Sequence, residues 1–222
     1  QFELDWLKRW NSYSPNNKAI TDAQTGHTLS YSELYEKSCV GAGYLKTHFQ
    51  IKPGDRVVHL STNEVSSFIL FFSLARLGAT LVPINYRLTA QELGYVIENA
   101  EPNLVVFEEA FLPALKDVES KIPIKENRWL PLVGKNSFEQ ALHTTQDSLT
   151  DFLSTSATTA LIIYTSGTTG FPKGAMISHQ MLFWNSINTT LRLNLSEKDS
   201  AGIFLPLFHL GGWNVLSTQF FH

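Results

Sequence analysis

One ten-residue segment of the sequence combines the residue types that bind phosphate groups. Residues 165–174 read Thr-Ser-Gly-Thr-Thr-Gly-Phe-Pro-Lys-Gly and follow an apolar run, 161–164, that predicts a buried strand. The three glycines permit positive φ angles and a close approach of the backbone to a ligand, the hydroxyls donate hydrogen bonds, and Lys173 adds a positive charge. The segment therefore predicts a polyphosphate site. Its residues are Thr165, Ser166, Gly167, Thr168, Thr169, Gly170 and Lys173.

Other classes of loop fit this segment less well. An exposed polar loop has a similar composition, but the position directly after an apolar strand favours a binding site. A Walker A loop requires Gly-Lys-Ser/Thr, whereas Lys173 follows Pro172 and precedes Gly174. The Gly-x-Gly-x-x-Gly fingerprint of dinucleotide sites does not occur in the sequence. The sequence therefore disfavours both the P-loop NTPases and the Rossmann dinucleotide enzymes.

The elements that must position this segment alternate between strand and helix. Capping boxes at Ser30 with Glu33 and at Thr89 with Glu92 each predict the start of a helix. Strands separated by helices pair in parallel, so the sequence predicts an α/β fold with a layered, mostly parallel sheet flanked by helices. The expected elements are a helix over 2–10, a hairpin of strands at 18–22 and 27–30, a helix over 30–45, strands at 56–60, 80–83, 103–107 and 161–164, a helix over 64–77 and a weak strand at 129–130 within an irregular region, 116–156.

Length and composition fit one large globular domain or two small ones. The 222 residues include 17 Lys and Arg and 20 Asp and Glu, which gives a formal net charge of −3. Because the longest basic run is Lys8-Arg9, we expect no nucleic-acid partner. The single cysteine, Cys39, and the absence of a signal-peptide pattern favour a reducing, cytoplasmic location. The longest apolar stretch, 68–74, is too short for a transmembrane segment and predicts a core helix.

Residues 164–174 resemble the phosphate loop of the adenylate-forming superfamily, which includes acyl-CoA synthetases, luciferases and the adenylation domains of peptide synthetases. Segments 53–55, 77–79, 83–85 and 88–93 are similar to further landmarks of that family. The resemblance implies that the loop binds the phosphates of ATP, that Lys173 is a catalytic residue acting on the outer phosphates, and that Thr168 helps to place Mg²⁺. It also implies the fold of the large N-terminal domain of these enzymes.

A second segment, 204–212, is similar to the part of the family that runs from a strand into a helix beside the acyl pocket. The resemblance implies that His209 is catalytic, at the strand end facing the reacting carboxylate and the α-phosphate. A lone histidine among apolar residues is otherwise a core histidine bonded to a backbone carbonyl. Trp213 either borders the acyl site or packs in the core, and Gly211 and Gly212 either make room for an acyl chain or cap a helix. Structural roles are expected for Arg87, His143 and Cys39.

The activity implied by the resemblance is the activation of a carboxylic acid by ATP to an acyl-adenylate, followed by acyl transfer to the thiol of coenzyme A. ATP, Mg²⁺ and coenzyme A are therefore the implied co-substrates and metal. Apolar residues surround His209 without a nearby acidic residue, which favours a medium or long aliphatic acid over an amino acid. Aryl acids stay open, and a non-catalytic nucleotide-binding or interaction module is the alternative function.

The resemblance also predicts that the 222 residues are an incomplete N-terminal domain. The family's Tyr-Gly-x-Thr-Glu and Thr-Gly-Asp segments and its C-terminal lid domain with a catalytic lysine do not occur in the sequence. We expect a first lobe at about 52–195, carrying the phosphate loop, and parts of a second lobe at about 17–50 and 200–222. The chain alone is expected to be inactive, and its exposed apolar face is expected to favour self-association into a homo-oligomer.

Overall fold

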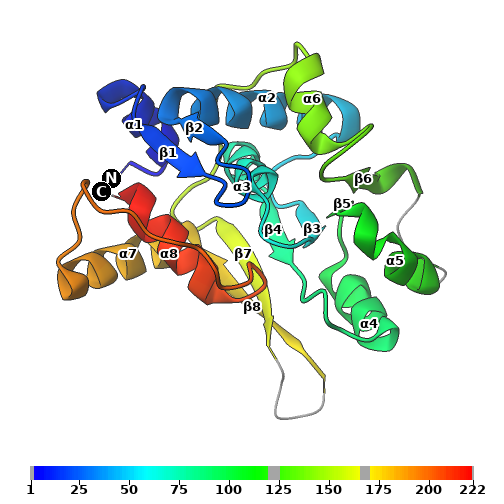
Figure 1. Ribbon diagram of the computed structural model, residues 1–222. Helices are drawn as coiled ribbons and strands as arrows, with labels where there is room; N and C mark the ends of the chain where they lie inside the picture. Colours follow the sequence, from blue (N-terminus) through cyan, green and yellow to red (C-terminus); the bar gives the residue numbers. More distant parts are fainter. Residues whose placement is uncertain (1–2, 120–125, 166–170, 222) are drawn as a thin grey trace.

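The computed structural model describes residues 3–119, 126–165 and 171–221. In this part of the chain a six-stranded sheet carries helices on both faces, and a separate two-stranded hairpin lies near the N-terminus (Figure 1). The strands are β1 (Lys18–Thr21), β2 (Thr28–Ser30), β3 (Arg56–Leu60), β4 (Thr80–Pro83), β5 (Leu104–Phe107), β6 (Trp129–Pro131), β7 (Thr159–Thr165) and β8 (Lys173–Ser178). The helices are α1 (Trp6–Tyr13), α2 (Tyr31–Phe49), α3 (Val65–Leu77), α4 (Ala90–Ala100), α5 (Leu112–Val118), α6 (Phe138–Thr144), α7 (His179–Leu193) and α8 (Leu210–Phe221), with short 3₁₀ helices η1 (Glu109–Phe111) and η3 (Glu126–Arg128).

The large sheet has the strand order β6-β5-β3-β4-β7-β8, and each neighbouring pair is parallel except β7 with β8. The predicted α/β fold with a mostly parallel sheet is therefore confirmed. From β3 the chain moves to β4 on one side, and from β4 it moves to β5 on the other side of β3. The connections that leave β3 and its neighbour β5 lead to opposite sides, toward β4 and β6, so the strand order reverses between β3 and β5. In open α/β sheets, the carboxyl ends of the strands at such a reversal are the usual place for a ligand.

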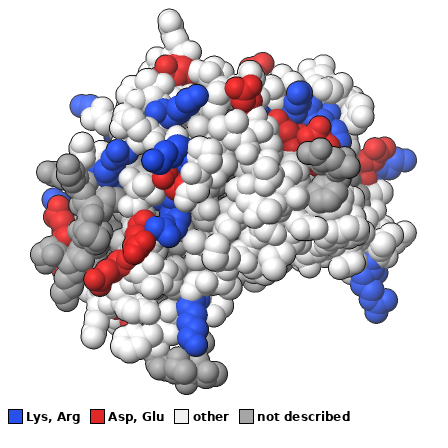
Figure 2. Space-filling model, turned by 180° about the vertical axis from the view of Figure 1, so that it is seen from behind, with Lys and Arg blue, Asp and Glu red and all other residues white. Residues whose placement is uncertain are grey.

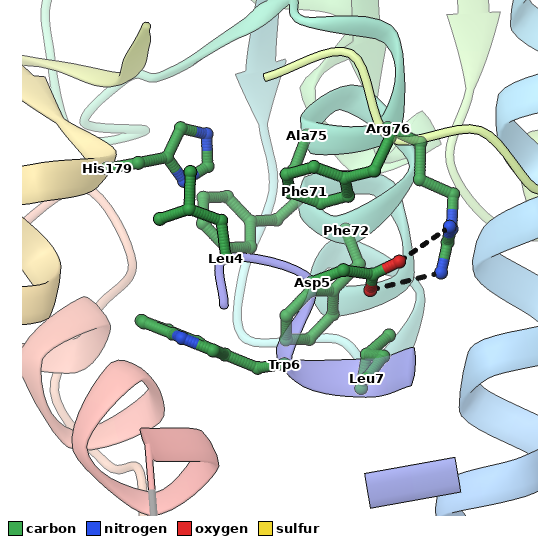
Figure 3. A pocket seen from close by; sticks show the side chains of 10 residues that line it. Leu4, Asp5, Trp6, Leu7, Phe71, Phe72, Ala75, Arg76 and His179 are labelled. Atoms are coloured by element: carbon green, nitrogen blue, oxygen red, sulfur yellow. Dashed lines mark hydrogen bonds and ion pairs between the residues drawn. The ribbon is translucent and has the colours of Figure 1, made fainter. Parts of the chain in front are cut away.

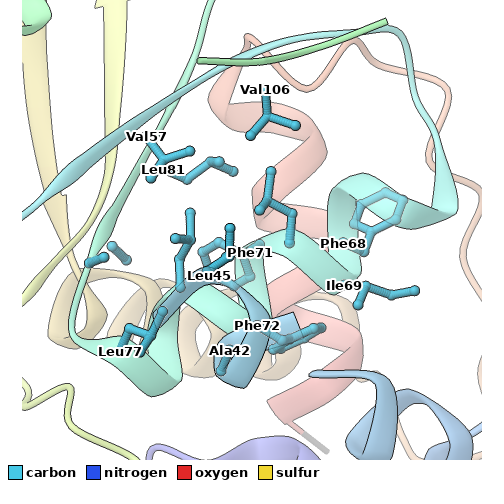
Figure 4. Packing of buried hydrophobic residues seen from close by; sticks show 14 of the residues in the cluster. Ala42, Leu45, Val57, Phe68, Ile69, Phe71, Phe72, Leu77, Leu81 and Val106 are labelled. Atoms are coloured by element: carbon cyan, nitrogen blue, oxygen red, sulfur yellow. The ribbon is translucent and has the colours of Figure 1, made fainter. Parts of the chain in front are cut away.

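Alternate residues of the central strands face two separate cores. Val57, Leu81 and Val106 point toward α3 and α2, as Figure 4 shows. Their neighbours Val58 and Val82 pack instead with residues of α4 and α5 on the opposite face. Burying such an aliphatic side chain contributes about 1.5–3 kcal/mol, so both faces of the strands favour apolar residues.

Helix α3 is the most deeply buried helix beside the sheet. Every residue from Ser66 to Leu77 is buried, which confirms the predicted core helix at 68–74. The helix ends where Gly78 adopts the left-handed conformation at φ 70°, and a side chain there would approach Pro53. Among the described residues, no helix combines the length and the hydropathy required to cross a membrane.

Both predicted capping boxes are present, at the start of α2 and of α4. The expectation of an irregular region over 116–156 is wrong in part, because α6 forms there. This seven-residue helix is too short for a clear periodic pattern, and it is stabilised by packing on α2. The ring of Phe138 fills the space beside Gly41, where an added Cβ would lie 2.8 Å from the ring.

Charged side chains are unevenly distributed over the surface. In Figure 2 they gather along the upper and left parts of the visible face, and a broad central area carries none. Several large apolar side chains are exposed in the described residues, mainly on β8, on α7 and in the segment before α8. They include Met176, Met181, Trp184, Leu191, Leu193, Phe204 and Leu205.

Candidate functional site

The predicted phosphate site lies on the β7–β8 hairpin, which extends beyond the ends of the other strands in Figure 1. Thr165 and Lys173 are the last paired residues on either side of the connection, and both are exposed. Lys173 therefore begins a strand, which holds its side chain close to the mouth of the loop. Five of the predicted phosphate-binding residues lie outside the described part of the chain: Ser166, Gly167, Thr168, Thr169 and Gly170.

Gly174 differs from the expectation that it supplies a positive φ angle. It lies within β8 opposite Tyr164, and it is not among the glycines with positive φ. A Cβ atom at Gly174 would lie 2.7 Å from Cγ2 of Ile162 and 3.3 Å from the ring of Tyr164. The glycine is therefore needed for space, because two bulkier side chains of β7 cross over its Cα.

Two contacts fix the base of the hairpin to α4. The hydroxyl of Tyr164 donates a hydrogen bond of 2.7 Å to Oδ1 of Asn99, and the ring of Phe171 lies 5.0 Å from the ring of Tyr95. Burial raises the pKa of Tyr164 to about 12, with a further contribution from Tyr95, so the hydroxyl stays a donor at neutral pH. Residues on both sides of the connection are thus held against α4.

A polar cluster that the sequence analysis missed lies at the carboxyl ends of β3 and β5. The carboxylate of Glu108 accepts hydrogen bonds from the hydroxyls of Ser61 and Thr62 and from the backbone N–H of Thr62. These residues follow directly after Leu60 and Phe107, the last residues of two adjacent parallel strands. Their position directly after predicted strands was the signal in the sequence that could have identified these residues. The cluster fixes the connection between β3 and α3 beside the reversal in strand order.

The segment before α8 is not a strand, so the expectation that His209 follows a strand end is wrong. Within 201–209 the backbone forms bends and turns, and its polar groups bond to the side chains of Asn63 and Trp213 instead of to a neighbouring strand. His209 is exposed, and its ring lies 4.5 Å from that of Phe208. A buried core histidine is therefore excluded at this position.

Trp213 and the glycine pair occupy the first turn of α8. The side chain of Trp213 is 1% exposed and packs against Phe68 and Phe71, which is the packed-core alternative for this residue. An added Cβ at Gly211 would lie 2.7 Å from Cδ1 of Leu205, and one at Gly212 would lie 3.1 Å from the Leu205 carbonyl oxygen. At both glycines, Leu205 therefore occupies the space that a side chain would need. Their role toward an acyl chain stays a prediction.

The 203–208 segment contacts the connections that follow β3 and β4. The ring of Phe208 contacts that of Tyr86 edge-on, with 5.2 Å between the ring centroids. The guanidinium carbon of Arg87 lies over the Tyr86 ring, 5.5 Å from its centroid. The segment that carries His209 thus lies beside the carboxyl ends of β3 and β4.

The other singled-out residues have placements that agree with structural roles. Cys39 is buried in α2, and Nε2 of His143 lies 3.4 Å from the Lys37 ammonium.

One further cavity is lined by α1, α3 and the start of α7 (Figure 3). A buried ion pair borders it, in which Arg76 donates to both oxygens of Asp5 at 3.0 and 3.3 Å. Arg76 also donates to Ser38 and to the Thr150 carbonyl, and it lies over the ring of Tyr35. Four of the five N–H groups of the guanidinium are thus bonded within the protein, so we interpret this cluster as a structural joint between helices.

A family model described as AMP-binding enzyme matches residues 7–221. The chain belongs to this family. A 2-succinylbenzoate–CoA ligase of Listeria innocua is 32% identical over 212 residues, which are 96% of this chain and 41% of that protein. The fatty acid–[acyl-carrier-protein] ligase ScoC of Streptomyces coeruleorubidus is 30% identical over 219 residues, covering 95% of this chain and 41% of that protein. The chain thus spans about two fifths of the length of these relatives.

Solved structures agree with this membership. ATP-bound MatB from Rhodopseudomonas palustris superposes with a TM-score of 0.82 at 27% identity, covering 99% of this chain and 44% of that chain. The N-terminal domain of FACL13 from Mycobacterium tuberculosis gives a TM-score of 0.85 at 24% identity, covering 100% of this chain and 55% of that one. At 24% identity, the similarity to FACL13 shows the fold alone. The adenylate-forming family inferred from residues 164–174 is therefore confirmed.

Proposed function

We propose that the full-length protein activates a carboxylic acid with ATP and then transfers the acyl group to coenzyme A. The observation that carries this proposal is the family match over residues 7–221, in a chain whose β7–β8 hairpin presents Lys173 beside the phosphate-loop segment. Relatives that are named CoA ligases support the thioester step. ScoC, which is named for an acyl-carrier-protein, makes a carrier thiol the alternative acceptor.

In the first step, a carboxylate oxygen of the acid attacks the α-phosphorus of ATP, and pyrophosphate leaves with the electron pair of the broken P–O bond. The reaction needs no nucleophilic side chain, since the protein only has to position the reactants and stabilise the developing charge. We assign charge stabilisation to Lys173, whose exposed ammonium is carried on a paired strand. His209 is proposed to face the carboxylate. In the second step, the thiolate of coenzyme A attacks the acyl carbon and AMP leaves.

Mg²⁺ accompanies ATP in this proposal and neutralises charge on the phosphates. The residue proposed to place it, Thr168, lies outside the described residues. Among the residues that are described, no group of three His, Cys, Asp or Glu side chains could hold a metal ion by itself. We propose that the ion arrives bound to the nucleotide.

We propose an aliphatic acid of medium or long chain as the substrate. Apolar side chains surround His209, and Phe204, Leu205 and Leu210 among them are exposed and available to an acyl chain. No acidic residue in 201–213 could pair with the amino group of an amino acid. Aryl acids are the second candidate, because the relatives include proteins named for succinylbenzoate, indoleacetate and ferulate.

The test is ATP–pyrophosphate exchange by the full-length protein with a panel of fatty, aryl and amino acids. We expect exchange with apolar acids, and a loss of about 10²–10³-fold in Lys173→Ala, as for other groups that stabilise transition-state charge. Lys198→Ala, at an exposed lysine in the α7–α8 connection, is the matched control and should keep its activity. Absence of exchange with every acid would refute the function, and a preference for amino acids would refute the substrate class.

A further inference from the structure

The side chain of Asn63 bonds to three backbone groups of the segment that leads to His209. Its amide nitrogen donates to the carbonyl oxygens of Leu205 at 2.9 Å and Ile203 at 3.3 Å. Its amide oxygen accepts from the backbone N–H of Leu207 at 3.1 Å. The partners are about 140 residues away in the sequence. One side chain therefore joins the β3–α3 connection to the segment before α8.

These bonds replace the ladder that a neighbouring strand would supply. The 203–207 segment has no strand pairing in the described structure, and its backbone groups still require partners. A primary amide carries the same donor and acceptor groups as a peptide unit, so Asn63 satisfies alternate residues of the segment as a strand would. On the other side, the indole of Trp213 donates to the Leu207 carbonyl.

Further hydrogen bonds hold the base of this contact. Asn63 follows Thr62, whose backbone and hydroxyl both donate to Glu108 at the end of the adjacent strand β5. His209 comes two residues after Leu207 and donates its own N–H to the Pro206 carbonyl at 3.0 Å. A displacement of Leu207 therefore also moves the turn that carries His209.

We propose that Asn63 is a positioning residue, which holds the 203–207 segment against the carboxyl end of β3 and thereby sets the place of His209 relative to the acid substrate. This inference rests on the proposed function. Asn63→Asp keeps the size and the acceptor of the side chain, but it places a carboxylate against two carbonyl oxygens and loses both donated bonds. The matched control is Asn103→Asp, because Asn103 is also exposed and uses only its Oδ1, which accepts from the N–H of Arg56.

The first measurement is hydrogen–deuterium exchange of the full-length protein, followed on peptides that contain 203–209. We expect the Leu207 amide to exchange about tenfold faster or more in Asn63→Ala, where it loses its acceptor. In Asn63→Asp the acceptor stays, and the 203–209 peptides should exchange faster because the bonds donated to Ile203 and Leu205 are lost. Asn103→Asp should exchange at the wild-type rate. This comparison does not depend on any enzymatic activity. Unchanged exchange in both Asn63 variants would overturn the inferred clamp.

The second measurement is ATP–pyrophosphate exchange, with the acid and ATP varied separately. We expect the KM for the acid to rise about tenfold in Asn63→Asp while the KM for ATP stays within about twofold, a split that general destabilisation would not produce. Faster amide exchange with an unchanged KM for the acid would overturn the positioning role and leave the proposed function intact. If the wild-type protein shows no ATP–pyrophosphate exchange with any acid, the proposed function and the positioning role are both refuted. This holds even where the amide hydrogen-exchange data confirm the clamp.

Discussion

Acidification from pH 7 to pH 5 should destabilise the fold, because two histidines are buried as neutral rings. His59 on β3 is 1% exposed, and its Nε2 lies 2.8 Å from the hydroxyl of Ser67. His179, the first residue of α7, is 7% exposed, and its Nε2 has no hydrogen-bond partner among the described residues. Burial lowers the pKa of each ring from 6.5 to about 4.

The size of the effect follows from proton linkage. As the pH falls below 6.5, the unfolded chain binds a proton at each histidine, and the folded chain does so only near pH 4. The stabilising contribution is therefore complete above pH 6.5 and is lost progressively as the pH decreases. Between pH 6.5 and 5, roughly 1.5 units at about 1.4 kcal/mol per unit, each histidine lowers the free energy of unfolding by about 2 kcal/mol. The two histidines together lower the free energy of unfolding by about 4 kcal/mol.

Urea unfolding at pH 7, 6 and 5 measures this loss, and His179→Phe isolates one half of it. The ring of His179 lies 6.4 Å from that of Phe71 and 6.3 Å from that of Phe152, and Leu4 lies beside it (Figure 3), so an apolar ring suits the site. The variant should lose about 2 kcal/mol less than wild type between pH 7 and 5. His27→Gln, at an exposed position, is the control and should follow wild type. A His179→Phe variant with the wild-type pH dependence would refute this reasoning.

Three further predictions concern the ion pair, the hairpin and the surface. Asp5→Ala should lower the free energy of unfolding by about 3–5 kcal/mol at pH 7, because it leaves the buried guanidinium of Arg76 without its carboxylate; a loss below about 1 kcal/mol in urea unfolding would contradict this. Gly174→Val should raise the KM for ATP in the full-length protein by about tenfold, since its side chain would collide with Ile162 and displace the neighbouring Lys173; an unchanged KM would argue against a role of the hairpin in ATP binding. The 222-residue chain alone should self-associate through its exposed apolar side chains, and Trp184→Lys should shift it toward monomer in sedimentation velocity. A wild-type chain that stays monomeric as its concentration increases would refute the last prediction.

Local signals in the sequence were sufficient for much of the fold. The capping boxes at Ser30 and Thr89 and the helix stop at Gly78 depend on hydrogen bonds and φ angles within a few residues, so short patterns reveal them. The phosphate loop was predicted in the same way, because its glycines, hydroxyls and lysine are contiguous. Strand and helix alternation also predicted the parallel sheet, since a parallel pair requires a crossover connection.

Tertiary structure alone decided the features that depend on residues far apart in the sequence. Gly174 looked like a loop glycine, and only the pairing of β7 with β8 shows that Tyr164 and Ile162 exclude a side chain there. Asn63 carries no local pattern, because its three partners lie about 140 residues away. The sequence by itself therefore determined the order of elements and the residue types available for phosphate chemistry. Long-range packing decided which side chains hold them in place, because the energy of such contacts depends on surfaces that meet only when the chain is folded.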